Sequence, residues 1–338
     1  MKILLLGSHM NYNLEHYVYM NLAKLGHEVR FYGYKGKLGR FANIIRMATT
    51  RSKPVRSLAG IFWLNRINSE IKKVAEEFRP DLVLSIKGET VKPETIKWFK
   101  QEIGAKTALW YPDDPRFFKS LVKHIAPSYD HVFTASERAI EMYRDIGCES
   151  VHFLPFACEP TVHKRVNLTK SETVAYNSDV IFVGTYTPRR ARLIKALEGA
   201  GINIKVYGPY WRLFKRGNNV YNGIYGTEMV KAFNAAKIVL NIHVEDDLPY
   251  KVNMRTFEAT GCGSFLLTDK SYGLEKMFIY GSELVCYEDE KELTELAKYY
   301  LEHGDECIKI GERGRERAYR EHTYEERVKK LLRLFGKL

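Results

Sequence analysis

The stretch from Asn253 to Gly263 contains the side chains best suited to bind a ligand. It predicts a short helix whose first turn carries Asn253 and Arg255 and which ends at Gly261 and Gly263, before a buried strand. A helix N-terminus presents unpaired N–H groups and a partial positive charge, so with Arg255 beside it this turn suits a phosphate. Glu258, one turn further on, could accept hydrogen bonds from sugar hydroxyls. Phosphate and polyol side by side suggest a nucleotide sugar as the ligand.

A second basic turn occurs earlier in the chain. Gly184 closes the apolar run 179–183, and Arg189 and Arg190 stand at the start of the next predicted helix. Backbone N–H groups and guanidinium forks suit a pyrophosphate, both when it binds and when it leaves. An arginine pair exposed on the surface is the alternative, and the sequence does not decide which arginine points inward.

Two further residues could complete a nucleotide site in the second half of the chain. Tyr210 lies in an aromatic loop after the predicted strand 203–208, where a nucleobase could stack, although the aromatic pair could equally belong to the core. His243 ends the predicted strand 238–243 and, with the acidic residues 245–247, could supply polar contacts.

Candidate proton acceptors lie in the first half. Asp113 and Asp114 follow a buried strand, and an inverting group transfer needs one carboxylate or imidazole to accept the proton of the acceptor hydroxyl. Adjacent acidic residues before Pro115 are also ordinary turn formers. His9, in the loop after the first strand, could hydrogen-bond a substrate, and Lys87, after another strand, could pair with a phosphate. Lone histidines are more often structural.

Metal and disulfide chemistry find little support. The five cysteines show no Cys-x-x-Cys spacing, and no further ligands cluster near Asp113 and Asp114, so we predict neither a zinc site, a disulfide framework nor any other bound metal. An odd number of cysteines without a secretion signal predicts a cytoplasmic protein. No stretch approaches the ~20 apolar residues that span a membrane.

Length and composition indicate two folded domains. The chain has 338 residues, enough for two domains of ~150 residues, and its 45% hydrophobic content is that of a globular protein. The formal net charge of +12 favours an anionic partner, which could be a nucleotide, an anionic lipid or a nucleic acid. Charge alone does not choose among them.

The order of predicted elements gives the domain organisation. Strands and helices alternate from the first residues, which predicts the α/β class with doubly wound parallel sheets. We expect an N-terminal domain at 1–155, a linker at 156–178, a second domain at 179–322 and a final helix at 323–338. The first loop lacks the Gly-x-Gly-x-x-Gly pattern, which argues against a dinucleotide site there.

The segment 35–53 is basic, with apolar residues interleaved. Such a stretch could rest on an anionic membrane surface as a peripheral contact or grip an acidic acceptor. A solvated loop and helix on a basic protein is the alternative.

The pattern Asn-x-Arg-x-Phe-Glu-Ala-x-x-x-Gly from Asn253 onward, followed by an apolar strand that ends in Thr-Asp, resembles the donor-binding segment of GT-B glycosyltransferases. The likeness is to the CgeB-like (spore maturation protein-like) group, and it covers roughly 179–332, including the runs 281–289 and 311–324. The resemblance implies two Rossmann-like domains facing a cleft, and a last helix that crosses back to the first domain.

The resemblance also implies a metal-independent glycosyltransferase, of the hexosyltransferase type, that uses a UDP- or GDP-sugar as substrate and no other cofactor. Arg189, Arg190 and Arg255 would hold the diphosphate and Glu258 the ribose, while the acceptor would enter from the first domain. The retaining enzymes have a second glutamate eight positions before Glu258, where this chain has Tyr250.

Two alternatives remain open at this point. A sugar-nucleotide epimerase or phosphorylase would have the same fold. A non-catalytic basic module that binds nucleic acid or a membrane surface would instead show affinity that falls steeply with salt. The positive charge is spread over both halves and forms no recognised nucleic-acid motif, so we expect no nucleic-acid partner. The acceptor, whether a glycan, a lipid-linked sugar or a protein, is not identified by the sequence.

Overall fold

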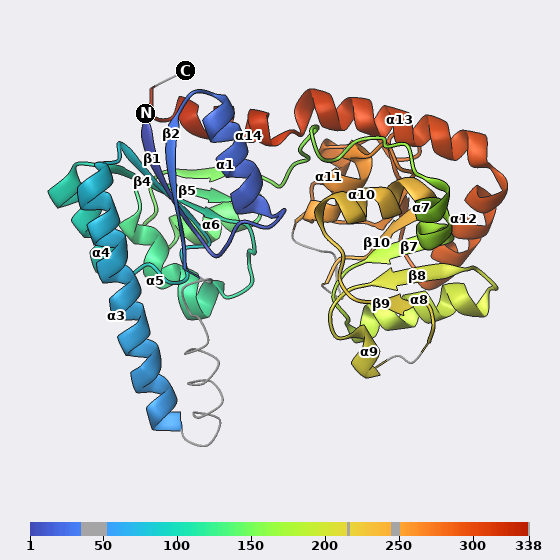
Figure 1. Ribbon diagram of the computed structural model, residues 1–338, viewed down its shortest axis with the longest axis horizontal. Coiled ribbons are helices and arrows are strands. Elements are labelled where there is room, and N and C mark those ends of the chain that lie inside the picture. The colour runs from blue at the N-terminus through green and yellow to red at the C-terminus, as the bar shows by residue number, and fades with distance from the viewer. Residues whose placement is uncertain (35–52, 215–216, 245–250, 337–338) are drawn as a thin grey trace. The chain divides into compact units, whose positions relative to one another are not determined.

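The computed structural model describes residues 1–34, 53–214, 217–244 and 251–336. The chain divides into two compact units, Met1–Pro155 and Phe156–Leu338 (Figure 1). We call them unit 1 and unit 2 and describe each by itself. Most of the basic segment 35–53, with its predicted membrane contact, and the acidic residues 245–247 lie outside the described residues.

Unit 1 is built on a parallel sheet with the strand order β2-β1-β3-β4-β5-β6. Its strands are β1 (Lys2–Gly7), β2 (Glu28–Gly33), β3 (Leu82–Ile86), β4 (Lys106–Tyr111), β5 (His131–Thr134) and β6 (Val151–Phe153). Residues 3–6 of β1 are fully buried, as expected for a continuous apolar strand covered on both faces. β1 pairs with β3 with Leu4 opposite Val83.

The helices of unit 1 connect these strands. They are α1 (Leu14–Lys24), α3 (Lys53–Phe78), α4 (Pro93–Trp98), α5 (Lys123–Ile125) and α6 (Ala139–Arg144), with short π-helical turns at Phe99–Ile103 and Phe118–Val122 and a 3₁₀ turn at Ala126–Ser128. Asn13 caps α1, because its side chain accepts the backbone N–H of His16.

Unit 2 repeats the architecture with the strand order β12-β11-β10-β7-β8-β9, again parallel. Its strands are β7 (Ser178–Val183), β8 (Ile204–Tyr207), β9 (Val220–Tyr221), β10 (Ala236–Asn241), β11 (Leu266–Asp269) and β12 (Val285–Tyr287). The predicted α/β class with two doubly wound parallel sheets is thereby confirmed.

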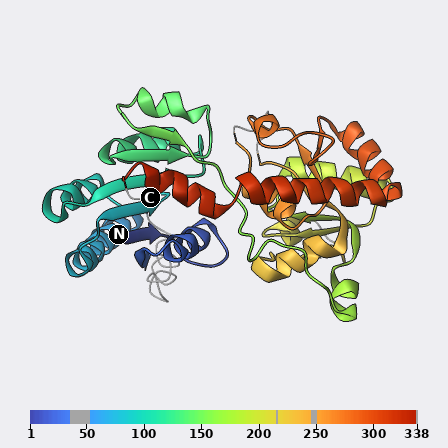
Figure 2. The same cartoon turned by 90° about the horizontal axis from the view of Figure 1, so that it is seen from above.

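Helices lie on both faces of the unit 2 sheet, with α8 on one face and α10 and α11 on the other (Figure 1). The helices of this unit are α7 (Lys170–Tyr176), α8 (Pro188–Gly199), α9 (Trp211–Phe214), α10 (Gly226–Ala235), α11 (Met254–Gly261), α12 (Glu290–Glu302), α13 (Gly304–Glu321) and α14 (Tyr324–Arg333), with a 3₁₀ turn at Leu274–Lys276. The long helix α13 packs against α11 and runs across unit 2 in Figure 2.

Glycines allow α13 to approach closely the backbone of the turns that lead into β11 and β12. A Cβ atom on Gly311 would lie 2.4 Å from the carbonyl oxygen of Gly263, and one on Gly314 would lie 2.4 Å from that of Glu283. Real Cβ atoms do not come this close to an oxygen. α13 therefore packs directly on the backbone that leads into these two strands.

The segment 156–178, which we predicted as a linker, carries its own structure in unit 2. It contains α7, whose start has a reciprocal capping box between Thr169 and Glu172. Nearer its beginning, Cys158 pairs with Thr323 in a parallel β-bridge. Arg327, in α14, donates to the carbonyl oxygen of Phe156 at 3.2 and 3.3 Å. The two ends of unit 2 are thus joined to each other.

The expectation that the last helix crosses back to the first domain stays a prediction. None of the helices among the described residues is both long and apolar enough to span a bilayer.

Candidate functional site

The carboxyl ends of the unit 2 strands meet at one edge of the sheet. β7 lies between β8 and β10, so the connections that leave β7 and β10 run in opposite directions. Doubly wound sheets bind ligands at such a switch point. We call the loops after β7, β8, β10 and β11, together with the start of α11, the unit 2 edge.

The loops after β7 and β8 are held against each other. A Cβ atom on Gly208 would lie only 1.9 Å from the carbonyl oxygen of Gly184, so the second loop reaches the first only because residue 208 is glycine. The indole Nε1 of Trp211 donates to the same oxygen at 2.7 Å. Gly184, predicted as a phosphate-binding turn, donates its own N–H to the carbonyl oxygen of Tyr207 at 2.9 Å, so both of its backbone groups have partners inside the protein.

The aromatic residues of the second loop have different environments. Trp211 is fully buried in the core, whereas the side chain of Tyr210 is 62% exposed. The ring of Tyr186, from the first loop, stacks on that of Phe214 with 4.5 Å between centroids. Exposed aromatic rings therefore lie beside the loop after β7, where the sequence predicted a contact to a nucleobase.

The two adjacent arginines at the start of α8 have different roles in the fold. Arg190 is buried and donates to the carbonyl oxygen of Ile242 from Nε at 3.0 Å and also from Nη2, and to that of Thr185 at 2.8 Å. It therefore ties the loop after β7 to the end of β10. Arg189 is partly exposed and donates from Nη1 to Asp269 at 2.7 Å. This arrangement favours Arg189 over Arg190 as a ligand contact.

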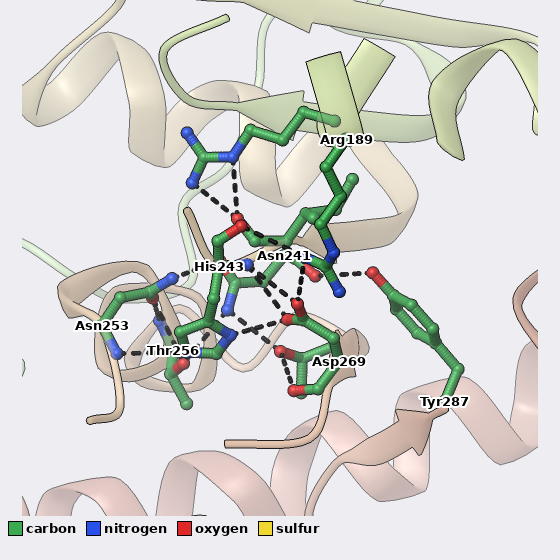
Figure 3. A network of polar contacts seen from close by, with 10 residues as sticks. Arg189, Asn241, His243, Asn253, Thr256, Asp269 and Tyr287 are labelled. Carbon is green, nitrogen blue, oxygen red and sulfur yellow. Dashed lines mark hydrogen bonds and ion pairs between the residues drawn. The ribbon is translucent and has the colours of Figure 1, made fainter. Parts of the chain in front are cut away.

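Asp269, at the end of β11, is the centre of a buried polar network (Figure 3). Besides Arg189, its carboxylate accepts the backbone N–H of His243 at 3.1 Å and the Nδ1 atom of the same residue at 2.6 Å. Burial alone would raise the pKa of Asp269, but its contacts with His243 and with the Arg189 guanidinium lower the pKa below its ordinary value. The carboxylate is therefore ionised near neutral pH.

His243, which we predicted as a donor-binding residue, is 1% exposed and uses both ring nitrogens inside the protein. Its Nε2 atom accepts the backbone N–H of Asn253 at 3.3 Å. His243 thus connects β11 to the start of α11 and has no nitrogen left for a ligand in this arrangement.

Asn253 is the N-cap of α11, as its position in the sequence suggested. Its Oδ1 atom accepts the backbone N–H of Thr256 at 3.2 Å, and its Nδ2 atom donates to Oδ1 of Asn241 at 2.9 Å. Asn241 in turn donates to the hydroxyls of Thr256 and Thr268. The first turn of α11 is therefore fixed by side chains from β10 and β11.

Arg255 and Glu258 form an ion pair on α11. The Arg255 side chain is 25% exposed, but Glu258 is only 1% exposed and its second oxygen lies 3.6 Å from Nε2 of His163. Burial raises the pKa of Glu258, and Arg255 opposes this shift. Burial lowers the pKa of His163 to about 3, so this histidine is neutral. In this arrangement Glu258 contacts Arg255 and does not face solvent.

Unit 1 has a corresponding switch point between β1 and β3, and we call the carboxyl ends of β1, β3 and β4 the unit 1 edge. There the Nζ atom of Lys87 lies 2.5 Å from a carboxylate oxygen of Asp113. Burial acts to lower the pKa of Lys87, but Asp113, followed by Glu89 and Glu15, raises it above its ordinary value. The Asp113 side chain is 33% exposed, so it combines a charged partner with access to solvent.

Asp114 is fully buried. One of its carboxylate oxygens accepts a hydrogen bond from the hydroxyl of Thr134 at 2.5 Å. The hydroxyl of Tyr143 lies 3.0 Å from each of the two carboxylate oxygens. Asp114 joins the loop after β4 to β5 and α6. Of the two predicted proton acceptors, only Asp113 is therefore placed where a substrate could reach it.

His9 lies exposed in the loop after β1. Its Nδ1 atom is 2.8 Å from the hydroxyl of Ser8, and its carbonyl oxygen accepts from Asn13 at 2.9 Å. Ser8 also donates to the buried carboxylate of Glu15. His9 belongs to the unit 1 edge by position in the fold.

The structure brings three predicted residues, Arg189, His243 and Asn253, into one network. It also adds residues that sequence reasoning did not assign to the site: Asn241, Thr256, Asp269 and Tyr287. Tyr287 donates to the carbonyl oxygen of Asn241 at 3.4 Å. A signal for Asp269 was present in the sequence, because a carboxylate that directly ends a buried strand lies at the ligand-binding edge of a parallel sheet. Within the described residues, no group of three or more His, Cys, Asp or Glu side chains is placed to hold a metal.

Comparison with known proteins places this geometry in context. Residues 189–333 match the family described as glycosyl transferase-like. Spore protein CgeB of Bacillus subtilis is 23% identical over 274 residues, which cover 76% of this chain and 83% of that protein.

Solved structures are similar over nearly the whole chain. A sucrose-phosphate synthase from Thermosynechococcus elongatus has a TM-score of 0.70 and 14% identity, covering 99% of this chain and 98% of that one. HepE of Anabaena, solved with UDP-glucose, has a TM-score of 0.69 and 13% identity, with 100% of both chains covered. The chain therefore has the GT-B fold and is similar to spore protein CgeB, as its sequence suggested, and residues 189–333, within unit 2, match a glycosyl transferase-like family.

Proposed function

We propose that the chain transfers a hexosyl group from a nucleoside-diphosphate sugar to an acceptor hydroxyl, with the donor diphosphate on the unit 2 edge. One observation carries this proposal: Arg189 pairs with Asp269 at the end of β11, and α11, which has Arg255 in its first turn, begins beside the same network at the switch point of the sheet. Two guanidinium groups and a helix N-terminus provide the charge that a diphosphate needs.

The state of Arg255 supports the proposal. Its Nε atom is buried and has no hydrogen-bond partner among the described residues. A buried N–H without an acceptor costs about 1–3 kcal/mol. A diphosphate oxygen would supply the acceptor. Direct contact of Glu258 with a ribose stays a prediction, and it would require a change in the Arg255–Glu258 pair.

The aromatic loop after β8 suits the base of the nucleotide. Tyr210, in the loop after β8, and Phe214, at the end of α9, are large exposed residues, at 62% and 66%. A base stacked there would leave its diphosphate near the loop after β7. HepE was solved with UDP and UDP-glucose, so a uridine nucleotide is the first ligand to test.

The proposed reaction is an attack of the acceptor hydroxyl oxygen on the anomeric carbon of the donor sugar. The new carbon–oxygen bond forms as the bond to the diphosphate breaks. We assign the hydroxyl proton to Asp113, the exposed carboxylate of the unit 1 edge, and the charge on the leaving diphosphate to Arg189, Arg255 and α11. In this mechanism the arginines do what a metal ion does in other transferases, so we propose no metal cofactor.

A nucleotide screen tests the proposal. Thermal shift and calorimetry with UDP, GDP, ADP and CMP should show protection by at least one nucleoside diphosphate, and Arg255→Met should weaken that binding about tenfold or more. Incubation with the matching nucleotide sugar, with and without inorganic phosphate, separates transfer from epimerisation and phosphorolysis by the products. Absence of protection by every nucleotide, together with binding to a polyanion that falls steeply with salt, would favour the non-catalytic basic module instead.

A further inference from the structure

The carboxylate of Asp269 lies at the centre of the unit 2 edge but cannot itself hold an anionic donor. It is 3% exposed, and as an ionised carboxylate it only accepts hydrogen bonds. We propose that Asp269 is a positioning residue: it acts through the His243 side chain to fix the backbone of Asn253, and so the helix N-terminus on which the donor diphosphate rests. This inference rests on the proposed function and extends it to a residue that touches no substrate.

Hydrogen-bond roles along the chain of contacts leave one arrangement of protons. Asp269 accepts at 2.6 Å from Nδ1 of His243, so this nitrogen carries the hydrogen. The other ring nitrogen, Nε2, then has a lone pair and accepts the backbone N–H of Asn253 at 3.3 Å. Asp269 thus favours the His243 tautomer with its hydrogen on Nδ1, and this tautomer lets Nε2 accept the Asn253 N–H.

Asn253 is held from three sides as a result. His243 accepts a hydrogen bond from its backbone N–H, Asn241 accepts one from its side-chain amide, and its own Oδ1 atom accepts the backbone N–H of Thr256. The next N–H groups of the helix, at residues 254 and 255, belong to its first turn, where N–H groups have no acceptor within the helix. They are the groups that a diphosphate would bind, and their direction follows that of Asn253.

The same carboxylate also orients Arg189. Its Nη1 atom donates to Asp269 at 2.7 Å and to the carbonyl oxygen of His243 at 3.2 Å. Asp269 therefore sets the position of two of the proposed diphosphate contacts, one on α8 and one on α11. In this proposal Asp269 touches no ligand itself, because Arg189 and the start of α11 make the contacts to the diphosphate.

Asp269→Asn breaks this arrangement while it keeps the shape of the side chain. The amide has one acceptor oxygen and one donor nitrogen. If the oxygen faces Arg189, the nitrogen faces Nδ1 of His243 and forces the hydrogen onto Nε2, against the Asn253 N–H. If the oxygen faces His243, the nitrogen opposes Arg189. Either orientation disturbs one diphosphate contact.

Two variants of His243 separate its two contacts. A glutamine at this position reaches as far as Nε2 and can still accept the Asn253 N–H, whereas an asparagine reaches only as far as Nδ1 and can still donate to Asp269. Asp179→Asn is the matched control, because Asp179 lies at the opposite end of β7 and pairs with Lys237 at 2.8 Å.

The experiment measures UDP binding by calorimetry at 20 °C and the ring nitrogens of His243 by ¹⁵N NMR in the full chain. We expect Asp269→Asn and His243→Asn to raise the Kd for UDP roughly tenfold or more, His243→Gln to raise it less than about threefold, and the control to leave it unchanged. In the wild type, Nδ1 should be the protonated nitrogen.

The outcomes distinguish the inference from the function on which it rests. If the wild type binds no nucleotide, the proposed function fails and the inference fails with it. If the wild type binds UDP and Asp269→Asn binds equally well, or if His243→Asn and His243→Gln weaken binding equally, only the inference fails. A purely structural role would lower the melting temperature of Asp269→Asn without changing the Kd.

Discussion

At the unit 1 edge, Lys87 and Asp113 form an ion pair in which the side chains remain 36% and 33% exposed. At the unit 2 edge, Asp269 is 4% and Arg189 14% exposed, and the carboxylate also holds His243. Both edges are switch points of similar sheets. The difference suggests a division of labour: a buried, cross-linked network can hold a ligand in a fixed geometry, whereas a solvent-accessible carboxylate can exchange a proton.

The largest effect should follow from removing the accessible carboxylate. Asp113→Asn should lower kcat by about 10²–10⁴-fold, because general base catalysis contributes this much, and leave the Kd for UDP unchanged. Steady-state kinetics and calorimetry measure the two quantities. Asp130→Asn, a carboxylate of unit 1 that accepts from Thr107 away from this edge, is the control. Full kcat in Asp113→Asn would contradict the assignment of Asp113 as the proton acceptor at the unit 1 edge.

The second largest effect concerns the buried network. Arg189→Met should raise the Kd for UDP about 10- to 100-fold, since hydrogen bonds to charged groups contribute about 1.5–3 kcal/mol. Arg192, one turn further along α8, pairs with Glu290 at 3.5 Å and has a side chain that is 70% exposed. Arg192→Met is therefore the matched control and should bind UDP normally. Equal losses in both variants would indicate a general effect of positive charge.

Asp114 sharpens the comparison. It is a buried carboxylate at the unit 1 edge, where we assign proton transfer to the neighbouring Asp113. Asp114→Asn should lower the free energy of unfolding of unit 1 by about 1–3 kcal/mol, because the amide replaces one buried acceptor oxygen with an N–H donor that faces the donating hydroxyl of Tyr143 or Thr134. Urea unfolding measures this. UDP binding should not change. A stable Asp114→Asn variant with low kcat would instead make Asp114 the base.

The last prediction is a pH dependence of the stability of unit 2. Burial, with Arg327, lowers the pKa of His322 to about 4, and burial, with Arg255, lowers that of His163 to about 3. Below the ordinary value of 6.5 the unfolded chain takes up protons that the folded unit does not. The free energy of unfolding should therefore fall as the pH decreases from 6.5 to 4, by at most about 1.4 kcal/mol per pH unit for each histidine.

Urea unfolding at pH 7 and pH 5, followed by hydrogen exchange of peptides from each unit, measures this loss. His322→Gln should flatten the dependence for unit 2, whereas substitution of the exposed His124 should not. Equal acid sensitivity of wild type and His322→Gln would contradict the assignment.

Much of the fold could be predicted because its signals are local. Apolar runs closed by glycine gave the strands, and Asn253 followed by Arg255 gave the capped start of α11. Ends shifted by a residue or two, as with the strand predicted at 238–243 and observed at Ala236–Asn241. Residues beyond Asn241 leave the strand because His243 turns toward Asp269.

The inner order of the site could not be predicted, because it depends on contacts between distant parts of the chain. Asp269 meets Arg189 across 80 positions and His243 across 26. In the adjacent pairs Arg189–Arg190 and Asp113–Asp114, a single residue step decides which side chain turns into the fold. Composition and spacing carry no information about that step. The assignment of individual site residues therefore stays a prediction for the binding assays.

The join between Cys158 and Thr323 matters for anyone who wishes to produce unit 2 alone. The family match begins at 189, and a gene fragment cut there would discard β7, which lies in the middle of the sheet. A fragment that stops before residue 323 would lose Thr323, which pairs with Cys158, and Arg327, which donates to the carbonyl oxygen of Phe156. The smallest self-consistent expression product therefore runs from 156 to about 336, with both tails retained.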